Sequence, residues 1–277
     1  MQKNTVYVDT LGIGEGFPVR VMGVLNTSPE SFYAESVEVQ GDQIVAKARQ
    51  MIEEGSSIID VGGVSTAPTA YYDTERVSTE VEMERIEYAL EILTDSIEVP
   101  ISVDTASSQV AERAIELGAS MINDVSGLQG DENMAEVISQ RNVPVVVMSS
   151  CASTCKSVEQ SLQSLKKSLQ IANITGIEQN KIIVDPGIGF GKSPDVDYEI
   201  IRELEMFKAL GQPILIGVSR KAFIGYLLNQ ENPSERLEGS IAVTSIAAAN
   251  GADIVRTHDV KETVVACRIG KKLRRGG

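Results

Sequence analysis

The stretch Ile182-Ile183-Val184-Asp185-Pro186-Gly187-Ile188-Gly189-Phe190-Gly191-Lys192 passes from an apolar run into a glycine-rich loop. Its β-branched start is typical of a strand that is covered on both faces. Proline cannot donate to a sheet ladder, so the strand should end at Pro186 and leave Asp185 at its C-terminal end. A carboxylate in such a buried place needs partners, because its desolvation is costly without them. Asp185 therefore either ties down the glycine loop or holds a ligand.

Short apolar runs of this kind recur along the chain and alternate with longer amphipathic segments. The expected strands are Val19–Leu25, Ser57–Val61, Pro100–Val103, Met121–Val125, Pro144–Met148, Lys181–Val184, Pro213–Val218 and Asp253–Thr257. The expected helices lie near residues 42–54, 78–96, 107–117, 132–141, 157–173, 194–209, 237–250 and 260–274. Gly55, Gly118 and Gly251 each stand between a helical segment and a strand, where glycine commonly ends a helix. Thr105 or Ser107 is available to cap the helix near 107–117.

Eight strand–helix units in a chain of 277 residues predict an α/β fold of the TIM (β/α)8 barrel type. A doubly wound parallel sheet is the alternative. The early glycines do not favour it, because Phe17 stands where a dinucleotide-binding fingerprint needs its third glycine. We expect one domain over residues 1–277, with a short N-terminal β-hairpin over 1–18 and the barrel over 19–274.

The composition is that of an ordinary globular chain, with 42% hydrophobic and 23% charged residues. No apolar stretch is long enough to span a membrane, and the N-terminus carries no signal-peptide pattern, so we expect a cytoplasmic protein. The net charge of −14 opposes binding to nucleic acid or to an anionic membrane. Three cysteines argue against a disulfide framework, and the Cys151/Cys155 spacing with one histidine in the chain is a poor zinc set.

Polar residues stand at nearly every predicted strand end, which is where a TIM barrel carries its function. They are Asn26, Asp60, Asp104, Asn123, Asp124, Ser149, Asp185, Ser219, Lys221, Arg256 and His258. One set of them, Asp104, Asn123, Asp185 and Lys221, suits a flat heterocycle with donors and acceptors, such as a pterin or a purine. A second set, Asn26, Arg256 and His258, offers an oxygen ligand and two cations for a phosphate or a Mg²⁺-phosphate group.

Several of these residues also have a purely structural interpretation. Asp60 and Asp124 suit loop contacts or pairing with neighbouring cations, and His258 could be a structural histidine. Lys192 imitates a P-loop lysine, but that motif would need glycine at position 186, where proline stands. We exclude an NTPase on that ground. The glycines before Lys192 are expected to give mobility to an active-site loop, with Phe190 as its apolar tip.

Seven segments resemble the dihydropteroate synthase family in sequence and in order, over about residues 19–260. They are Met22-Gly23-Val24-Leu25-Asn26, Ile59-Asp60-Val61-Gly62-Gly63-Val64-Ser65-Thr66, Ser102-Val103-Asp104-Thr105, Ile122-Asn123-Asp124-Val125-Ser126-Gly127, Asp185 to Lys192, Val218-Ser219-Arg220-Lys221 and Arg256-Thr257-His258-Asp259. The blocks at 185–192 and 219–221 are the most specific.

The resemblance implies a pterin-binding transferase of folate or related pterin cofactor biosynthesis. Such an enzyme condenses 6-hydroxymethyl-7,8-dihydropterin diphosphate with p-aminobenzoate or a related arylamine and releases pyrophosphate, with Mg²⁺ as cofactor and often as a homodimer. Carried over by motif, Asp104, Asn123, Asp185 and Lys221 would hold the pterin. Asn26 would contact Mg²⁺ or the diphosphate, Arg256 and His258 the anion, Thr66 and Ser219 the diphosphate and arylamine side, and Phe190 would cover the arylamine. Lys221, Asp104, Asp185 and Arg256 would contribute most to catalysis.

The chain departs from the family in three loops. Residues 28–36 lack the family's Asp-Gly-Gly, Ala67 stands where the family has arginine, and Met148-Ser149-Ser150 replaces Met-His-Met. These departures leave the arylamine open. A pterin-dependent methyltransferase acting with a corrinoid protein is one alternative, although methyl transfer has no diphosphate for Arg256 and His258 to hold. A non-catalytic pterin-binding homologue is another.

Overall fold

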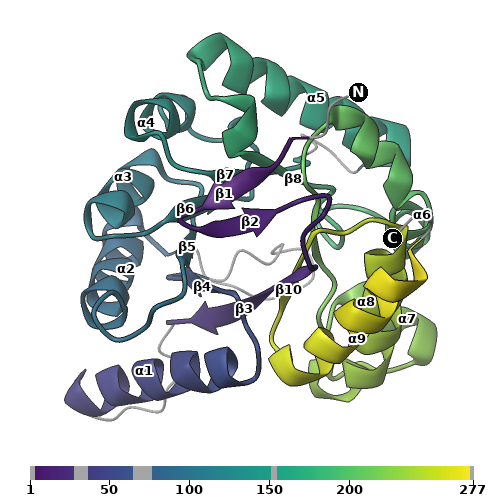
Figure 1. Cartoon of the computed structure of the whole chain (residues 1–277), viewed down its shortest axis with the longest axis horizontal. Coiled ribbons are helices and arrows are strands. Elements are labelled where there is room, and N and C mark those ends of the chain that lie inside the picture. Colours follow the sequence, from purple (N-terminus) through teal and green to yellow (C-terminus); the bar gives the residue numbers. More distant parts are fainter. Residues whose placement is uncertain (1–3, 28–36, 65–76, 151–154, 275–277) are drawn as a thin grey trace.

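Eight parallel strands form a barrel with helices around its outside, and a two-stranded hairpin lies across one end (Figure 1). The computed structural model describes residues 4–27, 37–64, 77–150 and 155–274, with the backbone alone for 37–40. The barrel strands are β3 (Arg20–Asn26), β4 (Ile58–Gly62), β5 (Ile101–Asp104), β6 (Met121–Asp124), β7 (Val145–Met148), β8 (Ile182–Asp185), β9 (Leu215–Gly217) and β10 (Ile254–Thr257).

The strand order decides between a barrel and a doubly wound sheet. The sheet runs β8-β7-β6-β5-β4-β3-β10-β9, and every pairing in it is parallel. Its two outermost strands meet through a parallel bridge between Val184 and Ile214, where the Val184 amide donates to the Pro213 carbonyl at 2.9 Å. The sheet is thereby closed into a TIM barrel, and the doubly wound alternative is wrong.

The helices follow the predicted alternation, with two differences. They are α1 (Val37–Glu53), α2 (Thr79–Leu93), α3 (Ser108–Glu116), α4 (Met134–Arg141), α5 (Val158–Thr175), α6 (Pro194–Arg202), α7 (Ala222–Leu228), α8 (Leu237–Asn250) and α9 (Val260–Leu273). The helix predicted over 194–209 ends at Arg202 and is followed by the 3₁₀ segment Leu204–Leu210, and α7 was not predicted. Ser107 caps α3 by accepting from the Val110 amide at 3.5 Å.

Two hydrophobic clusters hold these elements together. The larger one fills the space between the strands and the surrounding helices. The smaller one lies inside the barrel near the starts of its strands and includes Val6, Val8 and Ile13 of the hairpin strands β1 (Val6–Val8) and β2 (Leu11–Ile13). The hairpin therefore closes the N-terminal end of the barrel with apolar side chains (Figure 1). Only the other end is left for polar chemistry.

No helix in the described part of the chain is long and apolar enough to cross a membrane. Cys267 is a buried free thiol. Cys155 is disulfide-bonded, although the cysteine count argued against a disulfide framework.

Candidate functional site

A layer of polar side chains lies inside the barrel at the C-terminal ends of its strands. Arg256 on β10 reaches across to β4 and β5. Its Nε donates to Asp60 Oδ2 at 2.6 Å, and its Nη2 donates to Asp104 Oδ2 at 2.7 Å. Asn123 on β6 donates to the same Asp60 oxygen at 3.2 Å. The pairing of β10 beside β3 thus joins residues that are 196 and 152 positions apart in the sequence.

The charges in this layer compensate one another. Asp60 is fully buried, Asp104 is 2% exposed and the Arg256 side chain is 21% exposed. Burial alone would lower the pKa of Arg256, but Asp60 and Asp104 outweigh burial and raise it, so the guanidinium stays charged. The interpretation of Asp60 as the partner of a neighbouring cation is confirmed.

Some buried polar atoms of this layer are left without a hydrogen bond from the described residues. Asp60 Oδ1 and Ser102 Oγ, on register-paired residues of β4 and β5, are two of them. Ser149 Oγ, just beyond β7, is a third. Buried polar atoms are normally paired. These atoms are consistent with a site that is completed by a polar ligand or by water.

Asp185 takes part in the loop that follows β8. Its Oδ1 accepts from the Gly187 amide at 2.7 Å, so the loop-tether interpretation is confirmed. Among the described residues, no donor reaches its Oδ2. Burial raises the pKa of Asp185, while Lys221 and the Gly187 amide act in the opposite direction. One carboxylate oxygen is thus used internally, and the other is left for a ligand.

Lys221 follows β9 and extends to the same loop. Its Nζ donates to the Ile188 carbonyl and lies 4.5 Å from the centroid of the Phe190 ring. Burial lowers the pKa of Lys221 to about 8, although Asp185 favours the charged form. The ammonium is therefore mostly charged at neutral pH and links the β9 end to the glycine loop.

Lys192 was not predicted from the sequence to have a role, yet its side chain is only 3% exposed and organises this loop. Its Nζ donates to the Gly187 carbonyl at 2.7 Å and to the Phe190 carbonyl at 3.3 Å. From α6, Asp197 accepts from the Gly189 amide at 2.8 Å. A lysine at the end of a glycine run, with an aspartate five residues later, is the signal that could have predicted this arrangement.

The glycines of the loop are required for its shape, while the expected mobility of the loop stays a prediction. Gly187, Gly189 and Gly191 have φ values of +72°, +77° and +62°, which residues other than glycine rarely adopt. A Cβ on Gly187 would lie 2.7 Å from the Ser149 carbonyl oxygen, and one on Gly189 would lie 2.8 Å from Lys221 Cδ. The loop is a turn that hydrogen bonds of Lys192, Asp185 and Asp197 tie to its surroundings.

Ser219 and His258 form a separate pair at the mouth of the barrel. The Ser219 hydroxyl lies 3.0 Å from His258 Nδ1 and accepts from the His258 amide at 3.2 Å. Although the ring is open to solvent, desolvation by the protein around it lowers its pKa to about 4, and the Arg256 charge adds to this. From the sequence we expected His258 to act as a cation. In the free protein it is neutral at neutral pH.

The remaining residues that the sequence predicted make no described contact with this polar layer. Asn26 ends β3 with an exposed side chain, in register with Gly62 of β4. Asp124 serves its loop, because its two oxygens accept from the Ser126 and Leu128 amides, each at 2.7 Å. Thr66 lies outside the described residues, as do the altered segments 28–36 and 65–68. The structure therefore gathers most of the predicted heterocycle set and Arg256 in one place.

Comparison with known proteins agrees with this arrangement. The family model described as "Pterin binding enzyme" matches residues 22–258. A dihydropteroate synthase of Bacillus subtilis is 40% identical over 260 residues, which is 93% of this chain and 90% of that protein. A Clostridium difficile dihydropteroate synthase solved with pteroic acid has a TM-score of 0.88 at 38% identity and covers 95% of this chain and 98% of that one. A Xanthomonas albilineans dihydropteroate synthase with 4-aminobenzoic acid has a TM-score of 0.88 at 32% identity and full coverage of both chains.

The barrel, its polar layer and the matching family model define a pterin-binding TIM-barrel enzyme. Sequence identity of about 40% over nine tenths of the length narrows this class further. The chain belongs to the dihydropteroate synthase family.

Proposed function

We propose that this protein condenses 6-hydroxymethyl-7,8-dihydropterin diphosphate with p-aminobenzoate or a related arylamine and releases pyrophosphate. One observation carries the proposal. The C-terminal barrel end combines three carboxylates, one amide and two cations in a single buried layer, from Asp60, Asp104, Asn123, Asp185, Lys221 and Arg256. This layer offers both donors and acceptors, as the flat edge of a pterin requires. The related enzymes with pteroic acid and 4-aminobenzoic acid support the choice of substrates.

In this proposal the buried layer binds the pterin ring. Asp185 Oδ2 and Asp104 accept from the amino group and ring N–H of the pterin, and Asn123 and Lys221 meet its remaining polar edge. Hydrogen bonds to a charged partner contribute roughly 1.5–3 kcal/mol each. Arg256 stays fixed by Asp60 and Asp104, and its charge lies beside the place where the leaving group departs.

The diphosphate would lie at the mouth, near Asn26, Ser219 and His258. Among the described residues, no group of three acidic, histidine or cysteine side chains is placed to hold a metal. That fits Mg²⁺, which commonly takes few protein ligands and completes its shell with substrate phosphates and water. Asn26 would hold the ion with its side-chain oxygen. When bound, Mg²⁺ neutralises charge on the leaving diphosphate.

The chemistry then needs positioned residues more than acid–base groups. The C–O bond to the diphosphate breaks, and pyrophosphate leaves with the electron pair. The arylamine nitrogen forms the new C–N bond and afterwards loses a proton to solvent. Asp104 and Asp185 stabilise positive charge that develops on the pterin, and Arg256 stabilises the leaving oxygen. Phe190, on its hydrogen-bonded turn, covers the arylamine and keeps it in position.

We also propose that the protein is a homodimer. Ile246 on α8 and Val265 and Ile269 on α9 are each more than half exposed, and α8 and α9 pack against each other. A second copy would cover these apolar side chains. Sedimentation of an Ile269→Glu variant should show the monomer, with Ile174→Glu, an equally apolar but remote position, as the matched control.

The direct test of the activity is pyrophosphate release. The protein is incubated with the pterin diphosphate, Mg²⁺ and p-aminobenzoate, and then with other arylamines. Release is expected, and Lys221→Ala should abolish pterin binding while Lys261→Ala, an exposed lysine on α9, should not. Measurable pterin binding without release from any arylamine would refute the synthase proposal and favour a non-catalytic pterin-binding role.

A further inference from the structure

Four charged side chains contact the turn that follows β8, which spans residues 187–191. They are Asp185, Lys192, Asp197 and Lys221. The first three are buried, and charged side chains are almost never fully buried unless they are paired. The proposed function uses Asp185 and Lys221 to bind the pterin. It leaves Asp197 without a part in the reaction.

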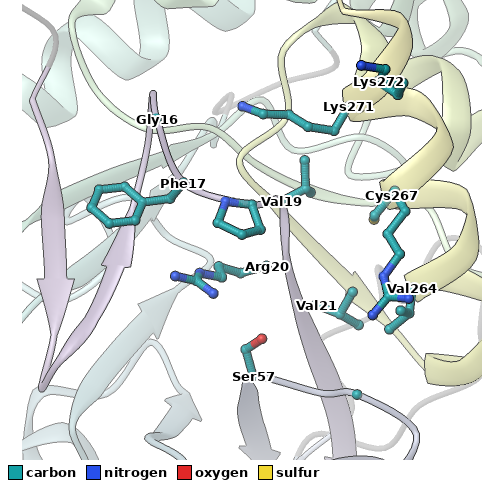
Figure 2. Close-up of a pocket in the computed structure, with 13 residues that line it drawn as sticks. Gly16, Phe17, Val19, Arg20, Val21, Ser57, Val264, Cys267, Lys271 and Lys272 are labelled. Carbon is teal, nitrogen blue, oxygen red and sulfur yellow. The ribbon is translucent and has the colours of Figure 1, made fainter. Parts of the chain in front are cut away.

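Basic residues at the opposite end of the barrel are arranged differently. Figure 2 shows a cavity of about 540 Å³ there, between β3 and α9. Arg20 extends to the hairpin side of β3, where its Nε donates to the Gly12 carbonyl at 3.0 Å, whereas Lys271 belongs to α9. These two cations lie apart and face different elements. Close packing of opposite charges is thus a feature of the turn after β8 rather than of this cavity.

Gly189 of the turn contacts both Asp197 and Lys221. Its amide donates to Asp197 Oδ1 at 2.8 Å. A Cβ on Gly189 would lie 2.8 Å from Lys221 Cδ and 3.6 Å from Lys221 Nζ, so the lysine side chain packs directly against the glycine. From α6, Asp197 therefore holds the backbone unit against which Lys221 packs.

Gly187 has the same arrangement with the other two residues. Its amide donates to Asp185 Oδ1 at 2.7 Å, and its carbonyl accepts from Lys192 Nζ at 2.7 Å. A Cβ on Gly187 would lie 3.1 Å from that ammonium nitrogen. Each of the two glycines thus has a carboxylate on its amide and a lysine against its Cα.

Helix α6 fixes the position of Asp197. Ser193 caps the helix by accepting from the Val196 amide at 3.4 Å, and the Ser193 carbonyl accepts from the Asp197 amide at 3.0 Å. Asp197 lies in the first turn, where the amides of a helix favour negative charge. Val196 and Ile200 are buried beside it. The helix, and not the turn, therefore decides where this carboxylate lies.

Asp197 also compensates the charges of both lysines. Burial lowers the pKa of Lys192 to about 8, while Asp197 and then Asp185 favour its charged form. Burial likewise lowers the pKa of Lys221 to about 8, while Asp185 and then Asp197 favour its charged form. Burial raises the pKa of Asp197 itself, and the Gly189 amide and the two lysines act in the opposite direction. In the proposed function Asp185 Oδ2 binds the pterin, so Asp197 is the carboxylate of the cluster that the substrate does not engage.

We propose that Asp197 is a positioning residue for the reaction proposed above, on which this inference rests. It holds Gly189 against Lys221, and it compensates the charges of Lys221 and Lys192 while Asp185 binds the pterin. Phe190 follows Gly189, so the same hydrogen bond places the ring that would cover the arylamine. Asp197 itself does not touch either substrate.

The charge of Lys221 provides a measurement that a merely structural role of Asp197 would not change. Charged or titratable neighbours of Lys221 lie on several elements: Asp185 at the end of β8, Lys192 after the turn, Asp197 on α6, Arg256 on β10 and His258 after β10. The two carboxylates favour the ammonium form, and Arg256 and Lys192 oppose it. Without the charge of Asp197, Lys221 should therefore lose its proton at a lower pH.

The test compares three variants. Asp197→Asn keeps an oxygen that can accept from the Gly189 amide but removes the charge, and Asp197→Ala removes both. Asp195→Asn, at an exposed position two residues earlier on α6, changes the net charge equally and is the matched control. Calorimetry with 6-hydroxymethyl-7,8-dihydropterin diphosphate measures affinity as a function of pH. The alkaline loss of affinity should move to lower pH by about 0.5–1 unit in Asp197→Asn and should not move in Asp195→Asn.

Turnover separates the hydrogen bond from the charge. At about pH 6, where Lys221 is charged, kcat/KM for p-aminobenzoate should fall about tenfold or more in Asp197→Ala. In Asp197→Asn it should stay within about threefold of the unaltered protein, because the acceptor for Gly189 is kept. Equal pH profiles of pterin affinity in Asp197→Asn and Asp195→Asn would overturn the proposal, and so would an undiminished kcat/KM in Asp197→Ala.

Two further comparisons keep these outcomes distinct. Pterin affinity needs no turnover, so absent pyrophosphate release from the unaltered protein would refute the proposed function while the pH shift is still measured. Thermal unfolding of each variant precedes titration. Where Asp197→Asn does not fold, Lys192→Met/Asp197→Asn replaces it, because this pair leaves neither charge without the other. Its alkaline loss of affinity should lie at lower pH than that of Lys192→Met, and equal profiles would overturn the proposal.

Discussion

Replacing Lys192 by methionine removes the ammonium that organises the turn after β8. The side chain is 3% exposed and donates to the carbonyls of Gly187 and Phe190 at 2.7 and 3.3 Å. Methionine fills a similar volume and lacks donors. The change therefore tests whether this internal cation positions Phe190 and Ile188, the residues that meet Lys221.

The change in the free energy of unfolding caused by Lys192→Met follows from two opposing contributions. The pKa of Lys192 falls from 10.5 to about 8 because of burial, which corresponds to about 3 kcal/mol of unfavourable charge burial. Two hydrogen bonds from a charged donor contribute about 1.5–3 kcal/mol each. The two contributions partly offset, so the free energy of unfolding should fall by no more than about 3 kcal/mol. The turn itself, however, loses both contacts.

We therefore expect a functional loss even where the loss of stability is small. With pterin diphosphate at saturation, kcat/KM for the arylamine should fall about 10- to 100-fold, which is about 1.4–2.7 kcal/mol of transition-state stabilisation. Affinity for the pterin, measured by calorimetry, should change by less than about threefold, because Asp104 and Asn123 are untouched. Lys156→Met, at a nearby exposed lysine, is the matched control. An unchanged kcat/KM for the arylamine would refute the reasoning.

Three further predictions concern stability and pH. Gly127→Ala should lower the free energy of unfolding by on the order of 3 kcal/mol in urea, because Gly127 has a φ of +65° and a Cβ there would lie 2.2 Å from the Met148 carbonyl oxygen. Asp60→Asn should lower it by about 3 kcal/mol, because it leaves the Arg256 guanidinium with one of its two carboxylates. In a pH profile, kcat/KM for the pterin diphosphate should fall as pH rises through about 8, where Lys221 loses its charge.

The sign of the pH effect separates activity from stability. Burial holds the pKa of Lys221 in the folded protein at about 8, below its ordinary value of 10.5. Between these values the unfolded chain binds more protons, so this group makes the folded state more stable as pH rises. Activity lost above pH about 8 should therefore occur without loss of thermal stability. In the Lys192→Met variant, kcat/KM for the pterin diphosphate should still fall above pH about 8. If it does not fall there, the titrating group is Lys192 and not Lys221.

Matched controls exist for the two stability predictions. Gly16→Ala also has a positive φ, of +91°, but a Cβ there meets nothing within 4 Å, so it should lose less stability than Gly127→Ala. Asp195→Asn, an exposed carboxylate in the first turn of α6, should change the free energy of unfolding by less than 1 kcal/mol. A loss below 1 kcal/mol for Asp60→Asn would show that Asp104 alone compensates Arg256.

Local pattern predicted the barrel strands because each is a short apolar run with a turn signal beside it. Helix ends were predicted where a single residue decides them, as at Ser107 and Gly118. Helix α7 was missed because Ala222–Leu228 is nearly all apolar and shows no helical period. The end of α6 at Arg202 was also missed, because no glycine or proline follows it in the sequence. There, Leu204 and Phe207 are buried three residues apart, the spacing that a 3₁₀ turn places on one face.

The sequence by itself determined which chemical groups stand at the strand ends, because each is fixed by its own strand and the turn after it. The tertiary structure decided which of these groups meet. Arg256 pairs with Asp60 and Asp104 because β10 pairs with β3 and β3 with β4, and the curvature of the barrel brings β5 within reach of the same side chain. The charge of His258 and the role of Lys192 were also decided there. Lys192 is buried by its loop, and His258 is influenced by Arg256 and by the protein around it, so both depend on neighbours from distant segments that no local pattern reveals.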